Sequence, residues 1–184
     1  MKFWKREYPR KEGVSSFRED TNFVKEVAME DLMNVASYVY NRYKSENGTN
    51  IDEMKLHKLM YFAQRESLIQ DNEPLFDAVF YGWKFGPILK EIRIAYRDSA
   101  FYDEVPDDVI ARIFHVMDKV FEEYSTKDSW SLSRLTHGEL SWKKSRAGIA
   151  NGVNGDNAMR LEDIRKDAKR VRKRREMLSQ FGLI

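Results

Sequence analysis

The stretch DDVIARIFHVMDKVFEEY, residues 107–124, decides the fold class. Its apolar residues recur at steps of three and four, which places them on one face of an α-helix. They are Val109, Ile110, Ile113, Phe114, Met117, Val120, Phe121 and Tyr124. Pro106 precedes the stretch, and Asp107 and Asp108 supply the negative charge that the N-terminal end of a helix favours. The stretch therefore predicts an amphipathic helix with one buried face.

Outward from this helix, the same period predicts further helices. We expect them at about 29–45, 52–69, 129–137, 139–147 and 159–179, with another that begins at Pro87 and runs to about Tyr96. Residues 77–84, DAVFYGWK, break the helical period and are rich in β-forming aromatic residues. Residues 151–157 are rich in turn formers and predict a loop. The predicted fold is mainly α: a compact bundle of six to seven helices, with at most a short β-hairpin or extended segment near 77–84.

The composition excludes several classes of site. The chain has 184 residues, of which 42% are hydrophobic, 34% charged and 13% aromatic, as expected for amphipathic helices around an aromatic-rich core. It has no cysteine, which excludes disulfides and thiolate chemistry and removes most zinc sites. The three histidines, His57, His115 and His137, do not have metal-ligand spacing, and no phosphate-binding glycine loop occurs. We expect no catalytic residue, no metal and no cofactor.

The N-terminus differs in pattern from the rest. Residues 1–25 show no clean period, and we interpret them as an arm before a helical domain at 26–184. The arm is either a floppy tail or a segment whose aromatic residues dock on this domain or on a partner. It has no apolar region of a secretory signal, and no run in the chain approaches about 18 apolar residues. We therefore expect a soluble, cytoplasmic protein with no membrane partner.

The predicted last helix carries the densest charge. Between Arg165 and Arg175 the chain has eight Lys or Arg and one acidic residue, Asp167. Three interpretations remain open: a solvated helix face, a surface that docks on an acidic protein, or a contact with nucleic-acid phosphates. The same helix offers Ile164, Ala168, Val171 and Leu178 to the core.

Three further segments combine aromatic, basic and glycine residues too specifically for bulk packing alone. The first is Lys55-Leu56-His57-Lys58-Leu59-Met60-Tyr61-Phe62-Ala63-Gln64. The second is Trp83-Lys84-Phe85-Gly86-Pro87, and the third runs from Leu132-Ser133-Arg134 through Thr136-His137 and Glu139 to Trp142. Aromatic residues beside glycine indicate either tight core packing or an exposed binding surface.

These segments resemble, in order and spacing, the Panacea domain, also called the SocA-like antitoxin domain. The resemblance extends from about residue 31 to 171 and leaves out the arm. One departure is Phe85, where the family often has Tyr before Gly-Pro, so either the hydroxyl is not essential here or its role has moved to another residue. The resemblance implies a bacterial or phage type II antitoxin, without enzyme activity, that binds and neutralises a toxin protein encoded by the adjacent gene.

From these segments we predict candidate residues of two kinds. The partner-binding candidates are Lys55, Lys58, Tyr61, Trp83, Lys84 and Phe85. The structural candidates are Gly86, Pro87, Arg134, His137, Glu139 and Trp142, with Glu139, His137 and Arg134 expected to share an internal polar network. Alternative functions are a DNA-binding regulator of a mobile element, a proteolytic adaptor that delivers the toxin to a protease, and an unrecognised hydrolase.

Overall fold

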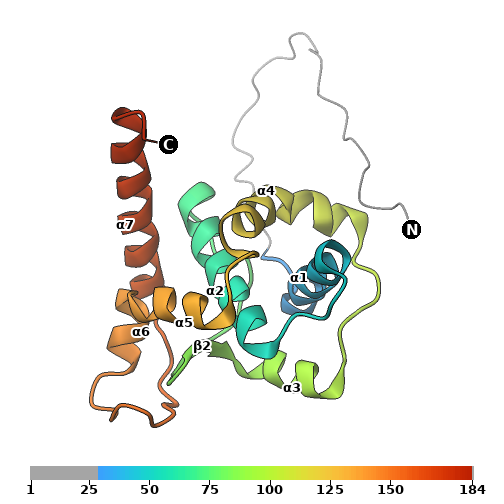
Figure 1. The fold of residues 1–184 in the computed structure, drawn as a ribbon, viewed down its shortest axis with the longest axis horizontal. Coiled ribbons are helices and arrows are strands. Elements are labelled where there is room, and N and C mark those ends of the chain that lie inside the picture. Colours follow the sequence, from blue (N-terminus) through green and yellow to red (C-terminus); the bar gives the residue numbers. More distant parts are fainter. Residues whose placement is uncertain (1–28, 184) are drawn as a thin grey trace, which may run out of the picture.

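The computed structural model describes residues 29–183 of the chain, so the predicted arm at 1–25 lies outside the described residues. Within 29–183 the structure has seven helices and one antiparallel hairpin, which confirms the mainly α prediction (Figure 1). The elements are α1 (Leu32–Asn47), α2 (Glu53–Gln70), β1 (Phe80–Trp83), β2 (Gly86–Leu89), α3 (Lys90–Asp98), α4 (Asp107–Tyr124), α5 (Ser129–His137), α6 (Leu140–Ser145) and α7 (Leu161–Gln180).

The helix α2 lies at the centre of the fold. Every residue from Lys55 to Ile69 is buried, because α1, α4, α5, α7 and the hairpin surround this helix. Its N-terminus is capped by the side chain of Asp52, which accepts the Lys55 N–H at 2.9 Å. A helix buried on all sides presents its polar side chains to neighbours and not to water, so those side chains need partners inside the protein.

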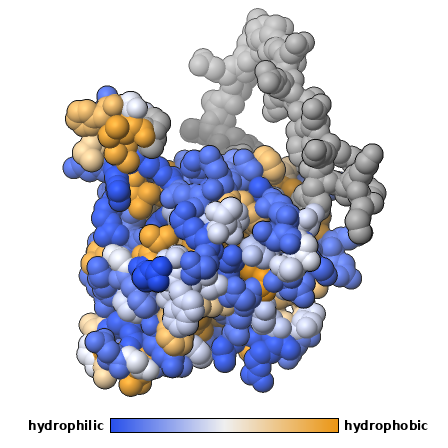
Figure 2. Space-filling view, in the orientation of Figure 1, coloured by the Kyte–Doolittle hydropathy of each residue, from blue (hydrophilic) through white to orange (hydrophobic). Residues whose placement is uncertain are grey.

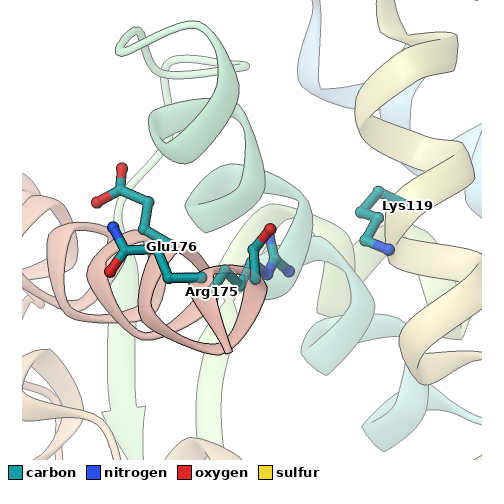
Figure 3. A pocket seen from close by; sticks show the side chains of 5 residues that line it. Lys119, Arg175 and Glu176 are labelled. Atoms are coloured by element: carbon teal, nitrogen blue, oxygen red, sulfur yellow. The ribbon is translucent and has the colours of Figure 1, made fainter. Parts of the chain in front are cut away.

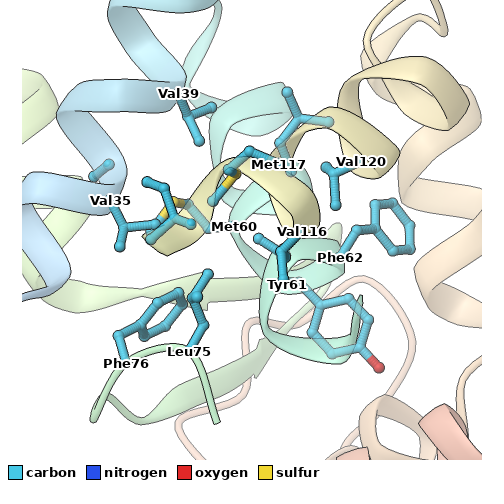
Figure 4. Packing of buried hydrophobic residues seen from close by; sticks show 14 of the residues in the cluster. Val35, Val39, Met60, Tyr61, Phe62, Leu75, Phe76, Val116, Met117 and Val120 are labelled. Atoms are coloured by element: carbon cyan, nitrogen blue, oxygen red, sulfur yellow. The ribbon is translucent and has the colours of Figure 1, made fainter. Parts of the chain in front are cut away.

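The apolar core lies between α1, α2 and α4 (Figure 4). Val35 and Val39 of α1 point at Met60 of α2, and Val116 and Val120 of α4 close the other side. The helix predicted at 107–124 occurs with those bounds, and its apolar stripe is the face that packs here. Aromatic pairs extend the core, such as Phe62 stacked on Tyr124 with ring centroids 4.1 Å apart.

The segment around Gly86-Pro87 differs from the prediction. We expected Pro87 to begin a helix, but Gly86–Leu89 is a strand that pairs with Phe80–Trp83, and α3 begins only at Lys90. The physical reason is the pairing itself. Phe80 and Leu89 face each other and are both buried, so the hairpin buries more apolar surface than an earlier helix start would.

The helix α7 packs on α2 and α6, and its buried residues all lie in its first half. Asp163, Ile164, Asp167 and Ala168 are buried, and no residue of α7 after Ala168 is. The later turns of this helix extend beyond the body of the domain (Figure 1). The exposed apolar residues at its end, Met177, Phe181 and Leu183, coincide with the hydrophobic tip in the space-filling view (Figure 2).

Candidate functional site

The turn of the hairpin is held against α2 and α5. Gly86 has φ +109°, and a Cβ there would lie 2.5 Å from both Lys58 Cε and Thr136 Oγ1. Only glycine fits this close approach. Ser133 Oγ donates a hydrogen bond to the carbonyl of Phe85 at 2.9 Å, and Lys58 Nζ donates to that of Pro87 at 3.0 Å. The turn is therefore held in place by side chains of α2 and α5.

The three sequence segments that resemble the Panacea family meet at this turn. From the first segment, Lys58 lies beneath Gly86, and from the third, Trp142 donates its indole N–H to the Trp83 carbonyl at 2.9 Å. His137 stacks on the Trp142 ring with centroids 4.0 Å apart. The second segment is thus positioned by the other two, which explains why the three occur together.

Beside the turn lies a pocket of about 410 Å³. We call it the hairpin pocket, and its walls come from α2, the hairpin, α3, α5 and the loop before α7. They are Glu53, Met54, His57, Lys58, Trp83, Lys84, Phe85, Ile88, Arg93, Trp130 and Asn154. Phe85 and Trp130 are 43% and 56% exposed, and their rings meet edge to face with centroids 5.2 Å apart. An aromatic wall is therefore open to solvent.

Charged groups also line the hairpin pocket. The Arg93 guanidinium lies 5.0 Å from the centre of the Trp83 ring and pairs with the Glu53 carboxylate at 2.7 Å. The Lys84 ammonium lies 4.7 Å from the centre of the Phe85 ring and makes no ion pair with another described residue. The pocket therefore combines aromatic faces with cationic groups.

Two buried basic groups form the floor. His57 Nδ1 accepts the Leu89 N–H at 3.3 Å, so in the neutral ring Nε2 carries the proton. That Nε2 lies 3.6 Å from Glu53 Oε1, and burial lowers the pKa of His57. Burial also lowers the pKa of Lys58 to about 7, although Asp52 and Glu53 oppose the shift. Burial disfavours the charged form of both groups because water cannot solvate them there.

Three of the six partner-binding candidates are not on the surface, which corrects that part of the prediction. Lys55, Lys58 and Tyr61 are 7%, 1% and 0% exposed because α2 is central to the fold. Lys55 Nζ donates to the Tyr43 hydroxyl at 3.1 Å, and the Tyr61 hydroxyl pairs with Ser141 Oγ at 3.0 Å. These residues hold neighbouring helices. Of the six candidates, only Trp83, Lys84 and Phe85 present accessible atoms at the hairpin pocket.

The polar network expected among Arg134, His137 and Glu139 does not form. Arg134 lies on the exposed side of α5 and bonds Ser131 Oγ at 2.7 Å. Glu139 instead lies at the N-terminal end of α6, where its side chain faces α2 and α7. It accepts Arg65 at 2.5 Å and Arg170 at 2.7 Å.

A different network, which we call the polar layer, therefore joins α2, α4, α6 and α7. It consists of Arg65, Tyr124, Glu139 and Arg170. Arg65 and Glu139 are buried, with 4% and 7% of their side chains exposed. Burial raises the pKa of the Glu139 carboxyl, against the opposing effect of Arg65. Arg65 and Glu139 thus stay paired at a buried position, where either charge alone would cost desolvation free energy.

Most of the basic run at 165–175 is used inside the domain. Arg165 bonds the Asn72 carbonyl, Lys166 pairs with Asp163, and Arg170 belongs to the polar layer. Arg172 donates to the Leu68 and Ile69 carbonyls near the end of α2, and Arg175 pairs with Glu66 and Glu123. Among the described residues, only Lys169, Lys173 and Arg174 of this run make no hydrogen bond or ion pair, so the run chiefly fastens α7 to the domain.

A second, more open pocket of about 660 Å³ lies between α4 and the end of α7 (Figure 3). Lys119, Arg175, Glu176, Ser179 and Gln180 line it. It has no aromatic wall, and Arg175 is already paired with two carboxylates. A shallow polar site of this kind offers little apolar area to a ligand, so the hairpin pocket is the better candidate.

The sequence did not single out several residues of the hairpin pocket. Trp130 and Arg93 come from helices whose apolar stripes predict packing, and neither residue belongs to its stripe. A tryptophan on the polar side of a short helix was the one signal for Trp130, and it is a weak one because single exposed apolar residues are common on protein surfaces. Nothing in the sequence places Arg93 over Trp83, since that contact depends on where the hairpin leads α3.

Comparisons with known proteins identify one family. Residues 56–143 match the family model described as antitoxin SocA-like, Panacea domain, which confirms the resemblance over that range. No curated protein and no solved structure matches the chain. Among the described residues, no group of three or more His, Asp or Glu is placed to hold a metal ion. None of the helices in 29–183 is long and apolar enough to span a membrane.

Proposed function

We propose that this chain, whose residues 56–143 carry a SocA-like Panacea domain, is the antitoxin of a type II toxin–antitoxin system that neutralises its toxin by direct binding. The toxin would be the protein encoded by the adjacent gene, and the two would meet in the cytoplasm. The antitoxin needs no reactive centre of its own, since covering or holding the toxin is sufficient to inhibit it. We accordingly propose that the chain is not an enzyme.

The observation that carries this proposal is the aromatic wall of the hairpin pocket. Phe85 and Trp130 lie exposed on a rigid turn and a helix, inside the range that matches the antitoxin family. Aromatic residues and arginine dominate the binding energy of protein interfaces, especially where they surround a pocket that a partner can fill. The turn is fixed by Ser133 and Lys58, so little conformational entropy would be lost on binding.

The proposal is tested by co-expression of the chain with the product of the adjacent gene. The wild-type chain is expected to rescue growth. Trp83→Ala is expected to weaken rescue because it removes a ring that lines the hairpin pocket and on which the Arg93 guanidinium packs. Phe181→Ala is the matched control, since Phe181 is 73% exposed at the far end of the chain. The purified pair should also elute as one complex from a sizing column. Separate elution at micromolar concentration would show that direct neutralisation is wrong.

A DNA-binding regulator is the second candidate, and three basic residues favour it. Lys169, Lys173 and Arg174 are exposed and lack partners among the described residues. A footprint of three cations gives a plot of log affinity against log salt with a slope of only about −3. A gel shift on the DNA upstream of its own gene, with an affinity that falls more steeply with salt than this slope, would favour this candidate over the antitoxin.

A further inference from the structure

The uncommitted polar groups of the hairpin pocket are nearly all donors. Lys84 Nζ and the indole N–H groups of Trp83 and Trp130 make no hydrogen bond with another described residue. His57 Nε2 is buried without a hydrogen-bond partner. A pocket with several unpaired donors favours a ligand that brings acceptors, because only then are those donors satisfied on binding.

Acceptors, in contrast, are scarce on the same walls. Among the described residues, Glu53 is the one carboxylate that lines the hairpin pocket, and it is committed to Arg93 at 2.7 Å. Asn154 adds a single amide oxygen. With Lys84 and Arg93 set against Glu53, the accessible walls carry a net positive charge before the buried Lys58 is counted. The pocket is therefore complementary to a negative group.

Apolar surface forms the rest of the pocket. The rings of Trp83, Phe85 and Trp130 stand around a space that Met54 and Ile88 complete. Its volume of about 410 Å³ lies near the lower end of the roughly 300–1,000 Å³ that is usual for ligand pockets. A pocket of this volume accommodates one side chain of a partner protein, or two side chains that lie next to each other.

We propose that the hairpin pocket takes an acidic residue adjacent to an aromatic or large aliphatic residue of the partner protein. The carboxylate lies against Lys84 and the indole N–H groups, and the apolar side chain lies among Trp83, Phe85 and Trp130. This assignment deepens the proposed function, on which it rests for the identity of the partner as the toxin. It predicts that the toxin presents an acidic patch with an apolar residue in it.

Single-stranded nucleic acid is a poorer fit to the same walls. Bases bind by stacking on parallel aromatic faces, whereas the Phe85 and Trp130 rings stand 82° apart. The Glu53 carboxylate would also lie close to the phosphates of such a strand. Within residues 29–183, the accessible cations of the pocket are Lys84 and Arg93, and Arg93 is already paired.

The first experiment needs no knowledge of the toxin. A library of random short peptides displayed on phage is selected on the immobilised full chain, with counter-selection on the Phe85→Ala/Trp130→Ala variant. Peptides that pair Asp or Glu with an aromatic or large aliphatic residue are expected to be enriched. Enrichment of peptides without acidic residues, or no enrichment at all, would overturn the proposal. So would tight binding of fluorescein-labelled oligothymidine that the double variant abolishes.

The second experiment uses the complex with the adjacent gene product. Lys84→Glu is expected to weaken binding by about thirtyfold or more, as for a central interface residue. Lys169→Glu is the matched control, because it makes the same charge change on an exposed part of α7, and it should change the dissociation constant less than threefold. Equal effects of the two variants would refute the pocket assignment and leave the antitoxin proposal intact. If the wild-type chain binds no toxin, the antitoxin proposal fails, and the peptide selection still decides the chemistry of the pocket.

Discussion

The hairpin pocket and the polar layer both combine basic side chains with aromatic rings, yet they differ in where their polar groups are satisfied. In the polar layer, Arg65 is bonded to Glu139 and Tyr124 and lies 4.9 Å from the centre of the Phe62 ring. In the hairpin pocket, Lys84 Nζ and the Trp130 indole N–H make no hydrogen bond or ion pair with another described residue, and Trp130 is 56% exposed. The same residue types thus stabilise the fold in one region and are available to a partner in the other.

This difference predicts that mutations in the two regions affect different properties. A change in the polar layer should lower the free energy of unfolding, because it leaves a buried group unpaired. A change at the rim of the hairpin pocket should leave folding nearly intact and weaken binding, because the rim makes few contacts within the domain. The following predictions, from the largest expected effect to the smallest, can break or sharpen this separation.

Glu139→Ala should have the largest effect. It removes the carboxylate that pairs with the buried Arg65 and with Arg170, so a guanidinium with 4% of its side chain exposed loses its counterion. We expect the free energy of unfolding to fall by about 3–5 kcal/mol, as for other buried ion pairs that lose one partner. Urea denaturation followed by circular dichroism measures it. Glu122→Gln, at the exposed pair with Lys119, serves as the control and should change stability by less than about 0.5 kcal/mol.

Lys58 should make the free energy of unfolding depend on pH between neutral and alkaline values. Burial lowers the pKa of Lys58 to about 7 in the folded chain, against an ordinary value near 10.5, so unfolding takes up a proton between these pH values. The free energy of unfolding should then rise with pH, by up to about 1.4 kcal/mol per pH unit, between about pH 7 and pH 10. The measurement is denaturation at several pH values with Lys58→Met for comparison. An identical slope in both proteins would show that Lys58 stays protonated in the fold.

Gly86→Ala should have a smaller effect on stability. The alanine Cβ would approach Lys58 Cε and Thr136 Oγ1 at 2.5 Å, and the residue would have to keep φ +109°. We expect a loss of about 1–3 kcal/mol, as for other strained backbone positions. Thermal unfolding measures this loss, and Gly152→Ala offers a control with a positive φ and no atom within 4 Å. Because Gly86 positions the turn, its substitution should also weaken binding.

The helices were predicted well where the apolar period is local. The helix at 107–124 and the helix at 129–137 have the predicted bounds, and Pro106 lies at the N-terminal end of the first, as predicted. Gly48, which follows Asn47, has the left-handed conformation that ends α1 and that glycine adopts without strain. Such features depend on residues within a few positions of one another.

The parts that the sequence could not predict depend on distant contacts. Pro87 satisfied the rule for a helix start, but its pairing with Gly82 across the hairpin decided otherwise. Arg65, Glu139 and Arg170 are separated by dozens of residues, so no periodicity links them. The motif that contains Lys58 and Tyr61 lies in the range that matches the family model, but the burial of both residues follows from the five elements packed around α2.

The most direct test of this account compares the Phe85→Ala/Trp130→Ala variant with the wild-type chain, both purified with the adjacent gene product. We predict a dissociation constant at least about thirtyfold higher, with a free energy of unfolding within about 0.5 kcal/mol of the wild-type value. An unchanged dissociation constant would contradict the role of the hairpin pocket in binding. A large loss of stability in the same variant would contradict the separation between the two regions.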